Sequence, residues 1–159
     1  METPEYFEAL KGSRKRLLAG DVFAVKPKGH DYLFGRVIRT DARVVSFTNC
    51  FLVYLYNVSA KNLNQLHLSD LTPKRLLLPP LIINRLPWSR GIFMTVGNFP
   101  IDRSDLLERH CFKTYEGRFF DEVSNQLSQP YEPVGIFGLW SYAALGEALS
   151  KILPKAALE

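Results

Sequence analysis

The sequence is short of the residues that build disulfide scaffolds and metal clusters. It has two cysteines, Cys50 and Cys111, which are far apart and belong to no Cys-x-x-Cys pair. Zinc ribbons, redox pairs and disulfide frameworks all need closely spaced cysteines, so the sequence supports none of them. The three histidines, His30, His67 and His110, do not fall at metal-ligand spacing either. We therefore expect buried thiols, no resident metal and no cofactor.

Long apolar runs are missing as well. The longest, Cys50–Tyr56 and Leu76–Ile83, are far shorter than the roughly 20 residues that a membrane-spanning helix needs. The first residues are polar and acidic and lack the apolar stretch of a secretory signal. These absences predict a cytoplasmic protein that contacts no membrane. Gly135-x-x-Gly138 lacks the third glycine and the Lys-Ser/Thr pair of a phosphate loop, so it predicts only a corner between a strand and a helix.

What is present is an ordinary globular composition with many aromatic residues. Of 159 residues, 47% are hydrophobic, 23% are charged and 13% are aromatic, and aromatic enrichment favours sheet. The length suits one domain, which we place at residues 1–157, with 158–159 interpreted as a remnant of an expression vector. The net charge is +4, and the only basic run is Arg14-Lys15-Arg16. Because no basic stripe emerges, we expect no nucleic-acid partner.

Hydrophobic patterning and turn residues predict a strand-rich α+β fold whose antiparallel sheet resembles a small barrel with an SH3-like start. Two helices are expected: a short one at Pro4–Lys11, and a C-terminal one at Ser141–Leu153 that packs on the sheet. The strands expected are Val22–Val25, Tyr32–Ile38, Val44–Phe47, Cys50–Tyr56, an edge segment Leu81–Ile83, Ile92–Val96, a hairpin of His110–Thr114 with Arg118–Glu122, and Val134–Phe137.

No pattern of residues declares a chemistry. His110 and Cys111 are neighbours on a predicted strand, so their side chains point to opposite faces and cannot form a nucleophilic pair. The pair Asp121-Glu122 is interpreted as solvated charge on an exposed hairpin. Trp88, Arg85 and Arg90 surround a proline turn, and this turn is our predicted protein-binding patch. The alternative is that Trp88 fills an edge of the core.

Three segments resemble the immunity protein 26 family of bacterial polymorphic toxin systems. They are the Gly20–Val25 strand with its Phe34-Gly35-Arg36-Val37 return strand, the segment Leu78–Ile83, and Trp88–Gly91. The resemblance extends over residues 15–152. It implies an immunity protein that binds and neutralises the toxin encoded beside it. The same family label carries a phosphotriesterase name, of the HocA type, so hydrolysis of organophosphate triesters is the alternative.

These implications favour a binding protein over an enzyme. A phosphotriesterase would need groups that activate water and hold the phosphoryl oxygen, and its candidates are His110, His30, Asp31 and Arg36. A metal site assembled from loops would draw on His30-Asp31 and His110-Cys111. A third and weaker hypothesis is that the chain is a small barrel that acts on RNA. We expect a monomer whose partner is a toxin domain. For a nuclease toxin, contact would involve an acidic patch of Asp102, Asp105 and Glu108, or the chain would block the toxin away from its active site.

Overall fold

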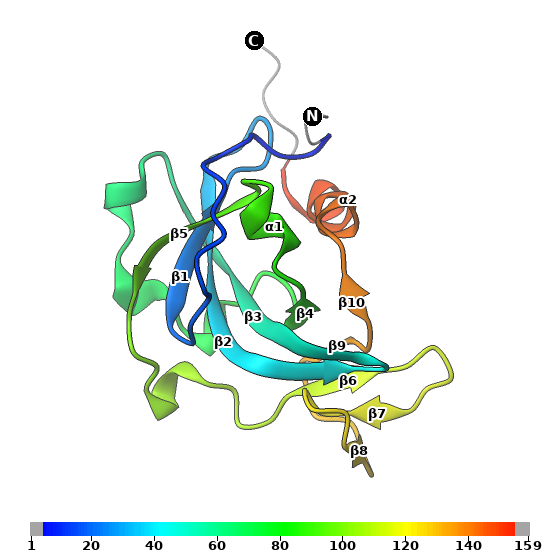
Figure 1. Ribbon diagram of the computed structural model, residues 1–159. Helices are drawn as coiled ribbons and strands as arrows, with labels where there is room; N and C mark the ends of the chain where they lie inside the picture. The colour runs from blue at the N-terminus through cyan, green and yellow to red at the C-terminus, as the bar shows by residue number, and fades with distance from the viewer. Residues whose placement is uncertain (1–4, 155–159) are drawn as a thin grey trace.

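The computed structural model describes residues 5–154. Its strands form two open, mixed sheets, one of six strands in the order β10-β4-β3-β2-β1-β5 and one of four in the order β8-β7-β6-β9 (Figure 1). The strand-rich α+β prediction is confirmed. Barrel-like is a loose description of it, because β10 and β5 remain as two edges of the larger sheet.

The larger sheet is built on three consecutive antiparallel strands, β1 (Asp21–Val25), β2 (Tyr32–Val44) and β3 (Phe47–Ala60). Its other strands are β4 (Leu81–Ile83), β5 (Phe93–Asn98) and β10 (Leu139–Trp140). Between β3 and β5 lie three short 3-10 helices and a one-turn α-helix: η1 (Leu63–Gln65), η2 (Leu68–Asp70), η3 (Pro73–Arg75) and α1 (Leu86–Ser89).

The smaller sheet follows η4 (Arg103–Asp105) and consists of β6 (Cys111–Lys113), β7 (Phe119–Phe120), β8 (Gln126–Leu127) and β9 (Val134–Ile136). The predicted β6–β7 hairpin is confirmed, since the Thr114 N–H donates to Arg118 O and the Gly117 N–H to Thr114 O. The last element is α2 (Tyr142–Ile152), capped by the Ser141 hydroxyl, which accepts the Ala144 N–H. This confirms the predicted C-terminal helix.

Each face of the larger sheet has its own core, because successive side chains on a strand point to opposite faces. On one face, Phe23 packs against Trp88 of α1 and Phe93 of β5, and Leu145 and Leu149 of α2 join the same cluster. On the other face, Phe34, Tyr54 and Tyr56 pack with Phe112 of β6. The two helices therefore cover one face, and the smaller sheet with the loop before it covers the other. Cys50 and Cys111 are both buried and unpaired.

The predicted N-terminal helix is wrong over residues 5–11, and Pro4 lies outside the described residues. This segment is irregular and is held by one bridge: Phe7 pairs with Pro27, the Glu8 N–H donates to Lys26 O and the Lys28 N–H to Tyr6 O. A helix of two turns is marginal by itself. Burying the Phe7 ring against the β1–β2 turn therefore outweighs the helix-start signal of Thr3-Pro4.

Two strand predictions also need correction. The expected turn at Thr40–Arg43 is part of β2, which continues with bulges to Val44, and the chain reverses at Val45-Ser46 instead. Ala42 is fully buried, so packing keeps this polar stretch in the sheet. The expected edge segment Leu81–Ile83 lies inside the sheet as β4, between β3 and β10, because Pro79-Pro80 precede the ladder rather than interrupt it.

Candidate functional site

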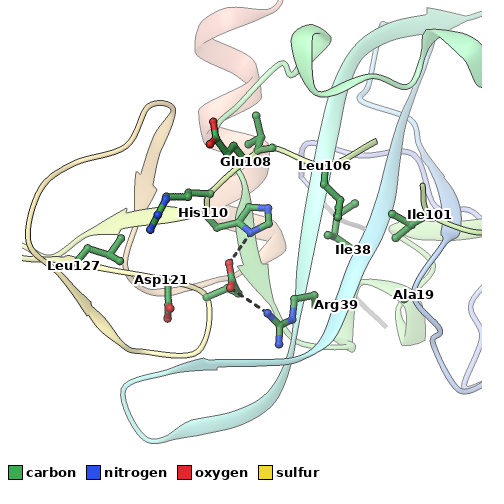
Figure 2. A pocket seen from close by; sticks show the side chains of 12 residues that line it. Ala19, Ile38, Arg39, Ile101, Leu106, Glu108, His110, Asp121 and Leu127 are labelled. Atoms are coloured by element: carbon green, nitrogen blue, oxygen red, sulfur yellow. Dashed lines mark hydrogen bonds and ion pairs between the residues drawn. The ribbon is translucent and has the colours of Figure 1, made fainter. Parts of the chain in front are cut away.

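A cavity of about 410 Å³ opens where β2, the loop before β6 and the β7–β8 turn meet. Figure 2 shows His110 and Arg39 approaching it from different elements, joined by dashed contacts to one carboxylate between them. That carboxylate belongs to Glu122. The cavity is lined by Ala19, Ile38, Arg39, Ile101, Leu106, Leu107, Glu108, Arg109, His110, Asp121, Glu122 and Leu127.

Tyr54 is the innermost member of the polar network behind this cavity. It lies on β3 opposite Arg36 of β2, and its side chain is fully buried. Its hydroxyl oxygen accepts the Leu107 N–H at 3.0 Å and lies 2.5 Å from Nε2 of His110. Burial raises the pKa of Tyr54 to about 12, and the Leu107 N–H offsets only part of that rise. Tyr54 therefore keeps its proton and can donate it in a hydrogen bond.

Glu122 links His110 to β2. Its Oε2 lies 2.5 Å from Nδ1 of His110, and its Oε1 accepts from Nη1 of Arg39 at 3.1 Å. Arg39 also donates from Nε and Nη2 to both oxygens of Asp41, at 2.8 and 2.9 Å. This bidentate hydrogen bond raises the pKa of Arg39 and lowers the pKa of Asp41. The result is a continuous chain, Tyr54–His110–Glu122–Arg39–Asp41, which we call the polar network.

One tautomer of His110 suits both its hydrogen bond with Tyr54 and its close contact with Glu122. If the Tyr54 hydroxyl donates to Nε2, its oxygen remains free to accept the Leu107 N–H, and the proton of His110 sits on Nδ1 facing Glu122. Both ring nitrogens are then engaged. His110 thus connects the two sheets: Nε2 meets the Tyr54 hydroxyl, and Nδ1 lies against the Glu122 carboxylate.

Arg36 has a different role. Only 2% of its surface is exposed, and its Nη2 donates to the carbonyl oxygens of Phe99 and Pro100. Its Nη1 lies 3.4 Å from Oδ2 of Asp105. Arg36 therefore attaches the loop between β5 and η4 to the sheet, and its charge is compensated by Asp105 of η4.

His30 and Asp31, in the β1–β2 connection, lie apart from this site. His30 lines a separate cavity with Phe7 and Gly146, and its backbone N–H donates to Pro27 O. The four candidate hydrolase residues are therefore not brought together. Within residues 5–154, no group of three or more His, Cys, Asp or Glu side chains is arranged to hold a metal ion.

The three residues of the predicted binding turn differ in exposure. Trp88 is buried at the centre of an aromatic cluster, with edge contacts to Phe23, Phe51 and Phe93. Arg85 and Arg90 are exposed on either side of it. Of the three residues predicted for the binding patch, Arg85 and Arg90 are exposed and Trp88 is not.

The predicted acidic patch is partly engaged within the chain. Asp102 and Asp105 form the capping box of η4, and Asp105 also pairs with Arg36. Glu108 is exposed at the rim of the cavity.

Sequence reasoning missed the residues at the centre of the network. The prediction that Glu122 is a solvated charge is wrong, because only 9% of its surface is exposed. The actual turn residue is Asp121, whose Oδ1 accepts the N–H groups of Val123 and Asn125. A signal for Tyr54 was present, since it lies in the apolar run Cys50–Tyr56 and a buried tyrosine hydroxyl needs a partner. No local signal pointed to Arg39 or Glu122, because their pairing spans 83 positions.

Comparison with known proteins finds one family. The family model described as Immunity protein 26 matches residues 19–117, which is more than half of the chain. The match includes Arg39, Tyr54 and His110 and stops before Glu122. No curated protein and no solved structure matches the chain. None of the helices in residues 5–154 is long and apolar enough to cross a membrane.

Proposed function

This chain belongs to the immunity protein 26 family, and we propose that it binds and neutralises a cognate toxin of a bacterial polymorphic toxin system. The observation that carries the proposal is the family match over residues 19–117. The geometry of the cavity supports the same conclusion. Its histidine is held between Tyr54 and Glu122, and its arginine between Glu122 and Asp41, so these groups stabilise the fold instead of standing free for catalysis.

Neutralisation by binding requires a stable, preformed surface and no reacting group. The polar network supplies rigidity, because it connects β2 and β3 of the larger sheet to the loop and the turn of the smaller sheet. An interface whose parts are already ordered loses less conformational entropy on association. The network is thus a means of presenting a surface, and the partner would be the toxin domain encoded next to this chain's gene.

The test is co-expression with that toxin domain. Cells that make the toxin domain alone should stop growing, and cells that also make this chain should recover, with the two proteins co-eluting on size-exclusion chromatography. Growth arrest that persists at matched expression, together with separate elution, would contradict the proposal.

A parallel assay addresses catalysis. The purified chain, with and without added divalent metal, should not hydrolyse a chromogenic phosphotriester above the buffer rate. Turnover that the substitution His110→Ala abolishes would show instead that the cavity is an active site, and the function would have to be revised to a hydrolase.

A further inference from the structure

Six exposed cations gather on one surface, away from the polar network. They are Lys11, Arg14, Lys15, Arg16, Arg85 and Arg90. Among the described residues, none of the six takes part in an ion pair. Like charges at close range repel one another, and within residues 5–154 no carboxylate forms an ion pair with them. We call this surface the cationic face.

Backbone contacts make the cationic face one continuous surface. Nη2 of Arg85 donates to Lys15 O at 2.9 Å, which joins the basic run to the start of α1. The Leu10 N–H donates to Gly91 O and the Ser13 N–H to Trp88 O, so the N-terminal segment lies along α1 up to Arg90. The N-terminal segment that carries four of these cations is therefore hydrogen-bonded to the backbone at the buried Trp88.

A groove of about 570 Å³ runs beside the cationic face, between the segment Lys11–Leu18 and strand β5. Its one acidic residue, Asp21, is already engaged: its carboxylate accepts the Leu18 N–H and the Nδ2 group of Asn98. Strand β5 pairs only with β1 and forms an edge of the sheet. Alternate residues of an edge strand direct unpaired backbone groups outward, where a polypeptide can bind them.

Aliphatic side chains among these cations indicate the class of partner. Leu18 is 50% exposed and Val96 is 37% exposed, and both line the groove; Leu86, beside Arg85, is 39% exposed. Apolar contacts within a charged rim are typical of protein–protein interfaces. Surfaces that bind single-stranded nucleic acid place aromatic rings among their cations for base stacking. The exposed apolar residues that line the groove, Leu18 and Val96, are aliphatic, which favours a protein.

We propose that the cationic face and the adjoining groove dock an acidic, partly apolar face of the partner toxin. This inference rests on the proposed function and adds the side of the chain that is used and the charge of the surface that it meets. The compensation that the six cations lack among the described residues would come from carboxylates of the toxin. Complementary charge would accelerate encounter, and the aliphatic residues would slow dissociation.

The experiment compares two charge-reversal variants that lower the net charge equally. The first carries Arg14→Glu, Lys15→Glu and Arg16→Glu on the cationic face. The control carries Lys61→Glu, Lys74→Glu and Lys113→Glu, three exposed lysines elsewhere that make no ion pair among the described residues. Rates of association with the neighbouring toxin domain are measured at low and high salt. We expect the first variant to associate about tenfold more slowly at low salt and to lose most of the salt dependence, with the control near wild type.

A second variant tests the aliphatic part without changing charge. Leu18→Ser should leave the association rate unchanged and increase the dissociation rate about tenfold, because burial of one aliphatic side chain contributes roughly 1.5 kcal/mol. Thermal unfolding of each variant distinguishes loss of contact from loss of fold.

The outcomes separate this inference from the proposed function. If the wild type rescues growth and all variants bind equally well, the cationic face is not the docking surface, although the immunity function stands. If the charge-reversal variant loses affinity only for a random-sequence RNA or DNA duplex, the face binds nucleic acid and the inference is overturned. If the wild type does not bind the toxin domain at all, the proposed function itself fails.

Discussion

Tyr54 illustrates how a single buried hydroxyl can organise a site. Its ring is part of the core, while its oxygen receives the Leu107 N–H and meets His110. Removing one partner of a buried hydrogen bond leaves the other unsatisfied, which costs about 1–3 kcal/mol. The loop before β6 is thus held in place by one side chain from β3. At the residue scale, the site depends on the protonated form of this tyrosine.

This dependence predicts a loss of stability at alkaline pH. Burial raises the pKa of Tyr54 to about 12, compared with about 10 in an unfolded chain. The unfolded state ionises first, so this contribution is complete below about pH 10 and is lost as the pH rises toward 12. The stability advantage of the wild type over Tyr54→Phe should therefore shrink by about 1 kcal/mol per pH unit in that range. Urea unfolding at several alkaline pH values measures this difference.

A matched control is Tyr115→Phe, which removes the hydroxyl of a fully exposed tyrosine in the β6–β7 turn. This variant should follow the pH dependence of the wild type. Burial also raises the pKa of Tyr56, but that effect is common to the wild type and both variants. A constant difference between the wild type and Tyr54→Phe across the alkaline range would contradict the role given to Tyr54.

At the element scale, the β1–β2 pair depends on the absence of one side chain. Gly35 is the cross-strand partner of Phe23, whose ring lies over the glycine. A Cβ at position 35 would collide with that ring and would lie 2.7 Å from the Tyr54 carbonyl oxygen. The Phe23 ring uses this space to stack on Phe93 and to meet Trp88 edge-on. Gly35 of the Phe34-Gly35-Arg36 motif therefore leaves room for the Phe23 ring to pack.

Gly35→Ala should lower the free energy of unfolding by about 2–3 kcal/mol, because overpacking forces both the ring and the strand to shift. Chemical unfolding followed by tryptophan fluorescence reports the change through Trp88. The control is Gly138→Ala, where the nearest atom to the new Cβ is a methyl group of Ile136 at 3.9 Å. That variant should remain within about 0.5 kcal/mol of the wild type. Equal losses of unfolding free energy in both variants would contradict this, because they would come from the glycine-to-alanine change itself and not from a collision with Phe23.

At the scale of the whole molecule, the two sheets are joined by contacts between residues far apart in the sequence. Glu122 contributes three of them: its side chain meets His110 and Arg39, and its carbonyl oxygen accepts the Arg43 N–H. The strands of the smaller sheet have two or three residues each, so they have few ladder hydrogen bonds of their own. We infer that the smaller sheet opens more readily than the larger one.

Glu122→Ala should increase this difference in local stability. Amide hydrogen exchange in residues 111–136 should accelerate about thirtyfold, equivalent to about 2 kcal/mol for a lost charged hydrogen bond, while β1–β3 change little. Hydrogen-exchange mass spectrometry measures both regions in one experiment. The control is Asp41→Asn, at the solvent-exposed end of the network, which should leave the exchange rates of both regions unchanged. A uniform acceleration in both sheets would indicate one cooperative unit.

Much of the local structure followed from the sequence, because its causes are local. The hairpin at Tyr115-Glu116-Gly117 came from turn residues between two aromatic runs, and α2 came from an apolar stripe behind a serine cap. The buried run Cys50–Tyr56 was recognised by its loss of alternation, and it forms the centre of β3. The family resemblance was also visible in short motifs, and the match over residues 19–117 confirms it.

Tertiary structure decided what depends on distant partners. Residues 5–11 form no helix because Phe7 pairs with Pro27, a contact that no local propensity encodes. Glu122 is buried because Arg39 and His110 reach it from other elements, although its place beside Asp121 at the end of a hairpin predicts a solvated charge. Trp88 is buried in the core, whereas Arg85 and Arg90 of the same turn are exposed. Periodicity and turn chemistry act over a few residues, whereas the burial and pairing of charges are determined by which strands the fold brings together.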